Sequence, residues 1–597
     1  MLLSIKNNNG VFVLLALEIF STSLHFTQAM CAEHTTISIS ESKQRLLQEF
    51  ADKEPPFYLA YLALLYAAHN MQPMWRDRAA VQQFQQQLVE VAMSGVQPQF
   101  TRWVDRLIDP NLSDFARDVI FSDAMLGYLQ FVSSIPIQGE RCLYGNVPYK
   151  LEQPSVALVN KWQNAVPSGS SVTFLSSLVP QHPQYPPMHD ALRQLLIDSR
   201  PWPRLKNHET LRPGQISNDV PALREILRRT GVLFAQVVSL KRTDDVVPPK
   251  ARISMDHILP LVESSSVDVN NLLEHRPSAA VKDMMNRTVG NNYNKILYDP
   301  KLVRAVKRFQ RWQGLGSDGT IGRRTREWLN VTPQMRAALL ALNIQRLRLL
   351  PVDMHNGIMV NIPNFSLTYY NNGIKILSSR VIVGRPDRKT PLMRSTINNV
   401  VLNPPWNVPR KLVRKDILPK LKQDPGYLYK HGYTLFSGSR THPKIINPNI
   451  IDWNVISASS FPYRLRQAPG KMNALGRYKF NMPSSDAIYL HDTPNHDLFQ
   501  NDIRALSSGC VRVNKASELA SLLLLEVGWD TSRISDQLKQ GSTRYVQIRH
   551  CIPVNLYYLT AWVADDGNPQ FRTDIYNYDN LAHCDVQLLE HVGKLLL

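Results

Sequence analysis

The sequence predicts a multidomain α+β protein, and three observations support this prediction. The chain has 597 residues, which suffices for about three to five domains, and 44% of them are hydrophobic. Apolar residues spaced three and four apart dominate the first 200 positions and indicate helices. From about residue 355 onward, β-branched and aromatic runs indicate strands. No run of about 18 apolar residues exists, which excludes a polytopic membrane protein.

Residues 1–32 have the pattern of a secretory signal peptide. Lys6 precedes an apolar stretch at 11–17, and the small residues Ala29 and Ala32 follow it. Glu18 interrupts the apolar stretch, so a frayed amphipathic segment is the alternative interpretation. The stretch is too short to span a bilayer. We therefore expect an exported protein.

Residues 33–205 are expected to form a mainly helical scaffold domain. The run 59–66 is strongly apolar, and Phe84, Leu88 and Val91 follow at helical spacing. The region contains no set of residues that could carry out catalysis, so its predicted role is structural.

A small helical domain is expected next, in two segments at 206–235 and 295–332. Leu302, Val306 and Phe309 mark an amphipathic helix over 299–313. A turn cluster at 314–319 then leads into a second short helix with Trp328 on it. The intervening residues 236–294 are assigned to an insertion. An ordinary helical hairpin is the alternative for this region.

Residues 340–580 are predicted to form a β-rich domain, followed by a tail at 581–597. Asn372-Gly373 is a strong hairpin signal between two strand-like runs, and Ala516–Val527 is expected to be a helix. The Lys- and Pro-rich segment 409–465 is expected to be a helical lid inserted in this domain. A solvated, charge-rich insertion is the alternative.

The charge of the chain is concentrated in one region. The formal net charge is +19, and residues 331–500 carry 23 basic and 8 acidic side chains, an excess of +15. A basic excess suits an anionic partner. A nucleic-acid binder would also interleave aromatic residues or show a known fold, so nucleic acid is not the expected partner. The five cysteines show no Cys/His spacing typical of zinc, so we expect no metal.

One segment contains the residues suited to chemistry. His491 ends a predicted strand, and Cys510 follows Ser-Ser-Gly 19 residues later. Gly509 tolerates unusual backbone angles, while Arg512 and the start of the next helix would favour a thiolate. His491 could act as a base if the fold brings it close to Cys510. A buried cysteine and a core histidine are the alternative.

The segment 488–513 resembles the signature of L,D-transpeptidases with a YkuD-type catalytic domain. The runs 464–476 and 406–409, together with Met74-Trp75, are similar to the large periplasmic YcbB-type subgroup. Residues 298–325 resemble the second half of a peptidoglycan-binding domain, although Arg323 stands where that family usually has Pro. Many L,D-transpeptidases have a His two residues before the nucleophile, and this chain has Ser508 there.

The resemblance implies a mechanism and a set of site residues. Cys510 would be the nucleophile, His491 the proton donor and acceptor, and Gly509 a backbone donor to the oxyanion. Before the reaction, His491 would be paired with the Cys510 thiolate. A thioester would form with release of D-Ala from a tetrapeptide stem, and a 3→3 crosslink between diaminopimelate residues would follow. The implied substrate-binding residues are Arg512, Tyr489, Ser508, Asn473 and Trp406. No cofactor is implied.

Several alternatives remain open at the level of sequence. Arg512 and Tyr489 could be structural. Asp492 invites a Cys-His-Asp interpretation, but neighbouring strand residues point to opposite faces, so we expect a backbone carbonyl to orient the imidazole of His491. Water or a lipoprotein lysine could replace the diaminopimelate acceptor. A non-catalytic scaffold that binds the cell wall is the rival from a different class.

The resemblance also implies a location and partners. Its substrates would be the peptidoglycan stems, as donor and as acceptor, in the periplasm of a Gram-negative bacterium. Glycan-synthesising enzymes and carboxypeptidases are possible partners, and neither nucleic acid nor a stable transmembrane span is expected. Cys551 and Cys584 could pair, although the sequence does not establish that they are close.

Overall fold

A computed structural model describes residues 37–233 and 296–582, except for residues 146, 148, 199 and 440. The expected signal peptide, the insertion at 236–294 and nearly all of the C-terminal tail, including Cys584, lie outside the described residues. The chain divides into two compact units. One comprises the residues up to Arg76 together with Asn111–Leu126, and the other comprises Asp77–Pro110 with the chain from Gly127 onward.

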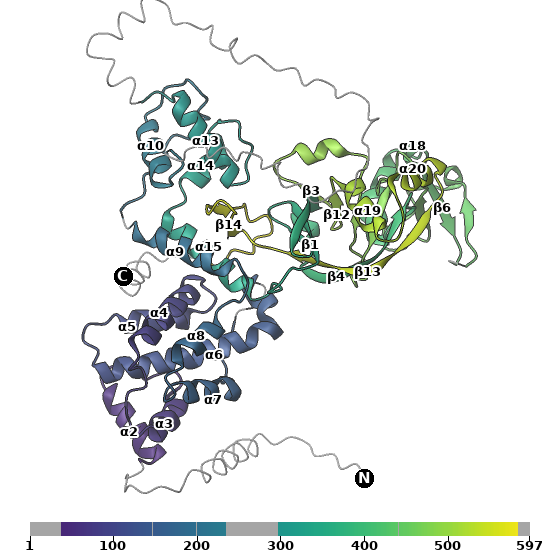
Figure 1. The fold of residues 1–597 in the computed structure, drawn as a ribbon. Helices are drawn as coiled ribbons and strands as arrows, with labels where there is room; N and C mark the ends of the chain where they lie inside the picture. The colour runs from purple at the N-terminus through teal and green to yellow at the C-terminus, as the bar shows by residue number, and fades with distance from the viewer. Residues whose placement is uncertain are drawn as a thin grey trace, which may run out of the picture. The chain divides into compact units, whose positions relative to one another are not determined.

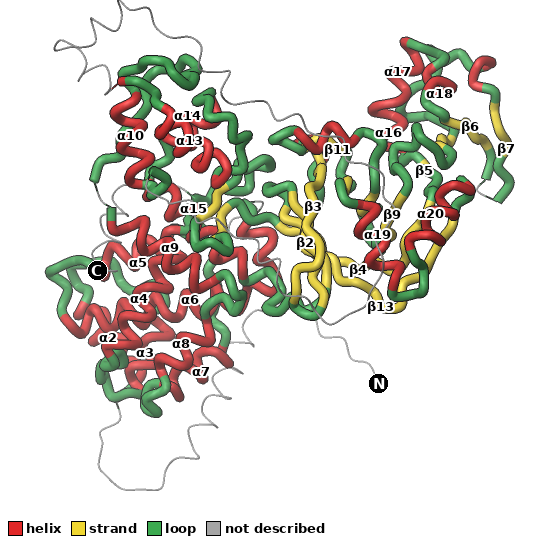
Figure 2. The backbone as a smooth tube through the Cα atoms, turned by 45° about the horizontal axis from the view of Figure 1, so that its top comes forward, coloured by secondary structure: helices red, strands yellow, loops and turns green. Residues whose placement is uncertain are grey.

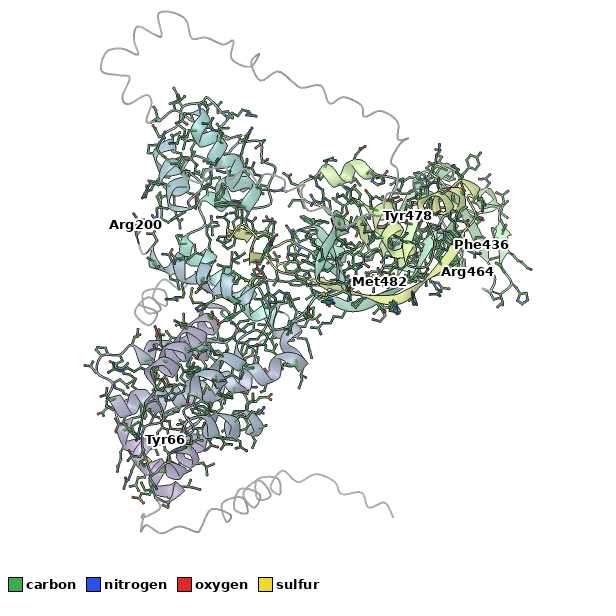
Figure 3. All side chains as sticks on the ribbon, viewed as in Figure 1. Tyr66, Arg200, Phe436, Arg464, Tyr478 and Met482 are labelled. Atoms are coloured by element: carbon green, nitrogen blue, oxygen red, sulfur yellow. The ribbon has the colours of Figure 1, made fainter. Side chains whose placement is uncertain are left out.

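The first unit is built around a buried carboxylate. It contains α2 (Ile39–Glu49), α3 (Leu59–Ala68) and the start of α6 (Asp114–Leu143). Asp118 on α6 accepts hydrogen bonds from the N–H groups of Met74 (3.0 Å) and Trp75 (2.7 Å) and from the Tyr66 hydroxyl (Figure 3). Because a buried carboxylate is costly unless it is hydrogen-bonded, these contacts hold the loop before residue 76 against the helix.

Among the described residues, one helix, α6, is long and apolar enough to cross a membrane. Its apolar window is 72% buried inside the fold, as in a core helix. This finding is weak evidence for a membrane span.

The helical part of the second unit follows the predicted scaffold. It contains α4 (Arg78–Met93), α5 (Pro98–Leu107), the rest of α6, α7 (Val156–Ala165), α8 (Ser171–Leu178) and α9 (Tyr185–Ile197) (Figure 1). A further helix, α15 (Pro333–Leu347), packs against α9 and α4 although it follows the small helical domain in sequence. The fully buried Arg346 on α15 bonds to Asp579 (2.6 Å) and to the carbonyl of Leu143 (3.1 Å). This arginine thereby links α6, α15 and the C-terminal segment.

The two segments assigned to the small helical domain share one hydrophobic core. The helices are α10 (Val220–Arg229), α13 (Pro300–Trp312) and α14 (Arg323–Leu329), and the core includes Leu211, Leu223, Ile226, Leu302, Phe309 and Leu329. The β-bridges Leu211–Ile321 and Ile216–Leu297 join the segments. The predicted helix at 299–313 is confirmed as α13, and Asp299 caps it by accepting a hydrogen bond from the N–H of Leu302 (2.9 Å).

Among the described strands of the C-terminal domain, the largest set forms a sheet of nine in the order β11-β3-β12-β10-β9-β4-β13-β1-β2. Figure 2 shows strands β2, β3, β4 and β13 of this domain in yellow. An additional pairing between β2 and β3 closes the strands from β3 to β2 into a ring. The strand bounds are β1 (Gly357–Asn361), β2 (Ser366–Asn371), β3 (Ile374–Gly384), β4 (Met393–Leu402), β9 (Tyr478–Asn481), β10 (Leu490–His491), β11 (Ala505–Ser507), β12 (Val511–Val513) and β13 (Arg544–Tyr557).

Several local predictions for this domain are confirmed. Asn372 and Gly373 have φ angles of 52° and 74° and join the antiparallel strands β2 and β3. The expected helix at 516–527 is α19 (Ala516–Leu525), and its buried face contributes Leu519 and Leu523 to the core of the sheet. Helix α20 (Thr531–Gln540) and the hairpin of β14 (Ala561–Val563) and β15 (Pro569–Phe571) complete the domain.

The lid, residues 409–465, is more than a helical insertion. It contains α16 (Arg410–Leu412), the π-helical turn η4 (Val413–Ile417), α17 (Leu418–Gln423) and α18 (Tyr427–Lys430). It also contains β6 (Tyr433–Ser437) and β7 (Lys444–Ile446), which join β5 (Trp406–Asn407) and β8 (Arg464–Gln467) in a sheet of order β5-β8-β6-β7. Phe436 and Arg464, labelled in Figure 3, are cross-strand partners. Leu421, Leu428 and Leu435 are buried in a core of the lid's own.

Candidate active site

Three basic side chains lie in one row across the centre of the sheet. Strand β10 pairs in parallel with β12 and antiparallel with β9, and this register aligns His491 with Arg512 on one side and Lys479 on the other. Aligned residues of neighbouring strands point to the same face of a sheet. The row therefore brings His491 together with the basic side chains of Arg512 and Lys479, and Arg512 follows Cys510 closely in the chain.

The turn that carries Cys510 is held by hydrogen bonds on both sides. We call residues 507–510 the nucleophile turn. The Ser507 hydroxyl donates to the carbonyl of Cys510 (2.6 Å) and accepts from the N–H of Gly509 (3.1 Å). The Thr390 hydroxyl donates to the carbonyl of Gly509 (2.7 Å). Gly509 has a φ of 123°, which a side chain would strain.

These bonds change the expected source of the oxyanion contact. The N–H of Gly509 is occupied by the Ser507 hydroxyl, so it is not free for a substrate oxygen. The N–H of Cys510 forms no hydrogen bond with any residue that the structure describes. The Cys510 N–H is thus the better candidate donor.

The Cys510 thiol is protonated in this environment. Burial raises its pKa, and this effect outweighs the opposing contributions of Tyr489, Lys479 and Arg512. The sulfur contacts the carbonyl of Ala487 at 3.8 Å. We expected a helix start to favour a thiolate, but Cys510 is not at a helix start, because strand β12 lies between it and α19 in the chain.

His491 is buried and neutral. Burial, followed by the charge of Arg512, lowers its pKa to about 3. Its Nδ1 lies 2.5 Å from the backbone carbonyl of Asp492, which confirms that a carbonyl orients the ring. Because a carbonyl can only accept, Nδ1 carries the proton and Nε2 is left as the basic atom.

Asp492 has a different partner. Its carboxylate accepts a hydrogen bond from the N–H of Arg477 (2.8 Å), so it does not complete a triad with His491. The thiolate–imidazolium pair expected from the sequence is not favoured here either, because the pKa of the thiol is raised and the pKa of the imidazole is lowered.

A cavity of about 440 Å³ brings most of the candidate site residues together. Its lining includes Cys510, His491, Gly509, Arg512, Tyr489, Ser508 and Trp406, together with Arg388, Lys411 and Leu412. The ring of Tyr489 lies edge-on to His491 with their centroids 5.6 Å apart, and the Lys479 ammonium lies 4.2 Å from the Tyr489 centroid. In the part of the chain that the structure describes, no group of three or more His, Cys, Asp or Glu could hold a metal ion.

Asn473 does not line this cavity. It is 2% exposed, and its amide nitrogen donates to the carbonyls of Pro404 (3.0 Å) and Ala468 (2.9 Å). Its oxygen accepts from the N–H of Leu475 (2.8 Å). With its amide used by the backbone, Asn473 shapes the loop beside the cavity instead of contacting a substrate.

Sequence reasoning missed three residues of this site. Lys479 joins the basic row through strand register, and Thr390 and Arg388 reach the nucleophile turn from the connection between β3 and β4. No local motif marks them, because Thr390 and Arg388 lie about 120 residues before the nucleophile turn and Lys479 meets His491 only through the pairing of β9 with β10.

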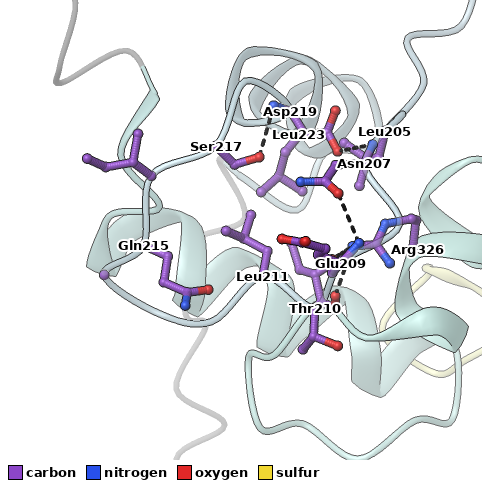
Figure 4. A pocket seen from close by; sticks show the side chains of 13 residues that line it. Leu205, Asn207, Glu209, Thr210, Leu211, Gln215, Ser217, Asp219, Leu223 and Arg326 are labelled. Carbon is purple, nitrogen blue, oxygen red and sulfur yellow. Dashed lines mark hydrogen bonds between the residues drawn. The ribbon is translucent and has the colours of Figure 1, made fainter.

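The small helical domain contains a second cavity, of about 410 Å³ (Figure 4). The Asp219 carboxylate accepts from the N–H groups of Lys206 (3.0 Å) and Asn207 (2.9 Å) on one side of it. Arg326 donates to the carbonyls of His208 and Glu209. The first residues of the loop that forms this cavity, 206–209, are thereby held by two charged side chains.

Comparison with known proteins gives three matching family models. An L,D-transpeptidase catalytic domain matches residues 355–538, a scaffold domain matches 60–192, and a "Putative peptidoglycan binding domain" matches 291–329. A protein of Haemophilus influenzae named "Putative L,D-transpeptidase" is 33% identical over 561 residues, which cover 92% of this chain and 86% of that protein. The chain belongs to the L,D-transpeptidase family. It is a cysteine L,D-transpeptidase, that is, an acyltransferase.

The solved structure of the Ldtfm–avibactam carbamoyl enzyme is 13% identical and matches 35% of this chain and 50% of that chain. Its TM-score is 0.16. The matched domains fit peptidoglycan stems as the substrate class and suggest an extracytoplasmic, wall-associated enzyme.

Proposed function

We propose that this L,D-transpeptidase forms 3→3 crosslinks in peptidoglycan through a thioester on Cys510. The observation that supports the proposal most strongly is the shared cavity, in which Cys510, His491 and Arg512 converge beneath the lid. This arrangement supplies a nucleophile, a base and a cation that suits a carboxylate.

The first step is attack by the Cys510 sulfur on the carbonyl between diaminopimelate and the fourth-position D-Ala. His491 is neutral, so its Nε2 can take the thiol proton as the carbon–sulfur bond forms. The Cys510 N–H stabilises the oxyanion of the tetrahedral intermediate. His491 then returns the proton to the nitrogen of D-Ala, the carbon–nitrogen bond breaks, and a thioester remains.

The second step transfers the acyl group to an amine. The side-chain amine of a second diaminopimelate attacks the thioester, and His491 takes its proton. The carbon–sulfur bond breaks, the proton returns to Cys510, and an amide links the two stems. Arg512 and Lys479 attract the carboxylates of both stems, and the excess of +15 in residues 331–500 steers the anionic polymer toward the cavity.

The remaining parts of the chain place this chemistry on the wall. In this proposal, residues 1–32 direct export to the periplasm of a Gram-negative bacterium, and the small helical domain binds peptidoglycan. The chain would belong to the YcbB-type subgroup, and a carbapenem would acylate Cys510. Tyr489, Ser508 and Trp406 would form walls of the stem-binding cavity.

Incubation of the full chain with tetrapeptide muropeptides, followed by mass spectrometry, tests the proposal. We expect crosslinked dimers and free D-Ala from the wild type and neither product from Cys510→Ala. Cys551→Ala is the matched control, because Cys551 is an exposed free thiol on β13, and it should keep full activity. Tripeptides without dimers would indicate water as the acceptor, and release of D-Ala only with an added lysine peptide would indicate lipoprotein anchoring. Activity in Cys510→Ala would refute the nucleophile.

A further inference from the structure

An arginine bridges the lid and the nucleophile turn. Arg388 is the last residue of the short helix η3 (Pro386–Arg388), and its side chain is 9% exposed. Its two terminal nitrogens bond to the two carboxylate oxygens of Asp416, with Nη2 at 2.6 Å from Oδ1. The other terminal nitrogen, Nη1, contacts Asp416 and also donates to the hydroxyl of Ser508 at 3.0 Å. One guanidinium thus holds a lid residue and a residue of the turn at the same time.

The lid end of this bridge is an irregular element. Asp416 lies in η4, the π-helical turn, and π turns inside α-helices are frequent at functional sites. The lid residues Lys411 and Leu412, immediately before this turn, line the active-site cavity. Arg388 lowers the pKa of Asp416, so the carboxylate is charged and the pair is intact at neutral pH. A bidentate pair of this kind fixes orientation as well as distance.

The other end of the bridge lies two residues before Cys510. The Ser507 hydroxyl already closes the turn internally, while the hydroxyl of Ser508 is exposed and directed to Arg388. The backbone around Arg388 also approaches the turn, because a Cβ on Gly509 would lie 3.8 Å from the carbonyl oxygen of Lys389. Arg388 is therefore joined to the turn by a side-chain hydrogen bond, and its backbone lies beside the turn.

We propose that Arg388 is a positioning residue through which the seated lid orients the nucleophile turn. Asp416 holds the guanidinium, and the guanidinium holds Ser508, so the catalytic geometry of Cys510 depends on where the lid lies. This inference rests on the proposed role of Cys510 as nucleophile. It assigns Ser508 to positioning, whereas the sequence suggested substrate binding.

A double-mutant cycle on the full chain tests the bridge. Asp416→Asn and Ser508→Ala each remove one end, and each should lower kcat for a tetrapeptide muropeptide by about tenfold with little change in KM, since a small misplacement of a reacting group is costly. The double variant should lose no more kcat than the less active of the two single variants, because both bonds act through one guanidinium. Losses that multiply, or an effect on KM alone, would overturn the proposal.

Three further variants separate positioning from general damage. Ser508→Thr keeps the hydroxyl and should retain most of the kcat, whereas a loss equal to that of Ser508→Ala would contradict the bridge. Asp424→Asn is the matched lid control, because Asp424 pairs with Lys430 within the lid at 2.8 Å, and it should keep full activity. Arg388→Lys replaces the planar fork by a single ammonium group, which cannot reproduce the bidentate pair with Asp416, and it should lose kcat about as strongly as Asp416→Asn.

An assay that needs no substrate tests the bridge separately from the proposed function. Iodoacetamide is small and alkylates Cys510 without any stem peptide being bound. Releasing the lid should expose the thiol, so Asp416→Asn should be alkylated roughly threefold or more faster than the wild type, while Asp424→Asn should match the wild type. If the wild type does not turn over stems, the proposed function fails and this comparison still decides the bridge. Equal alkylation rates in all three proteins would overturn it.

Discussion

Thr390→Val should destabilise the catalytic domain and loosen the nucleophile turn. The Thr390 side chain is fully buried, and its hydroxyl donates to the carbonyl of Gly509 (2.7 Å) and accepts from the N–H of Gly384 (2.8 Å). Valine has nearly the same shape but no hydroxyl. It would leave a buried N–H and a buried C=O without partners, and each costs about 1–3 kcal/mol. We therefore expect a loss of about 2–6 kcal/mol in the free energy of unfolding.

Calorimetry of the full chain measures this loss. For a domain of 150–250 residues, about 1 kcal/mol shifts Tm by roughly 2–4 °C, so the transition of the catalytic domain should fall by roughly 8–16 °C for a mid-range loss of about 4 kcal/mol. Thr390→Ser is the matched control. It keeps both hydrogen bonds, loses one methyl group and should cost about 1 kcal/mol. If valine and serine variants had the same Tm, the hydroxyl would not be what holds the turn.

Three further predictions concern the thiol and its turn. Alkylation of Cys510 by iodoacetamide should accelerate steadily as the pH rises through the raised thiol pKa. It should show no shoulder near pH 6.5, because His491 is neutral above its pKa of about 3. An inflection between pH 5 and 7 would instead indicate an ion pair between Cys510 and His491. Lys479→Met removes a charge that lowers the thiol pKa, so the alkylation profile should move to higher pH. An unchanged or lowered midpoint would refute the role of the basic row. Gly509→Ala places a Cβ at 3.3 Å from Ile488 on a backbone with a φ of 123°. Turnover should therefore fall at least tenfold, and the free energy of unfolding should fall by about 1–3 kcal/mol. A fully active variant would show that the turn tolerates a side chain.

Much of the secondary structure followed from local patterns. The amphipathic period around Leu302 and Phe309 predicted α13, and Asn372-Gly373 predicted the hairpin, because both signals arise from neighbouring residues. The lid was harder to predict. Its short strand β6 is held by pairing with β7 on one side and with the more distant β8 on the other, and the pairing with β8 depends on residues distant in sequence.

The candidate site was predicted in part. His491 and Cys510 were found because the spacing of the motif is itself local. Asn473 was assigned to the substrate, yet its amide is used by the loop backbone, and only the folded loop brings the carbonyls of Pro404 and Ala468 within its reach. The sequence also suggested that nearby positive charge would lower the pKa of Cys510. Burial opposes these charges and raises the pKa instead.

By itself, the sequence determined the α+β domain plan, the basic excess and the pair of His491 and Cys510, because composition, period and motif spacing are properties of the linear chain. Tertiary structure alone decided which side chains surround that pair. Strand register placed Lys479 and Arg512 beside His491, and a bridge across the cavity wall joined Asp416 of the lid to Ser508. The physical reason is that burial, charge separation and hydrogen bonding act through space, and the residues that tune this thiol are brought together by the closure of the sheet and the folding of the lid.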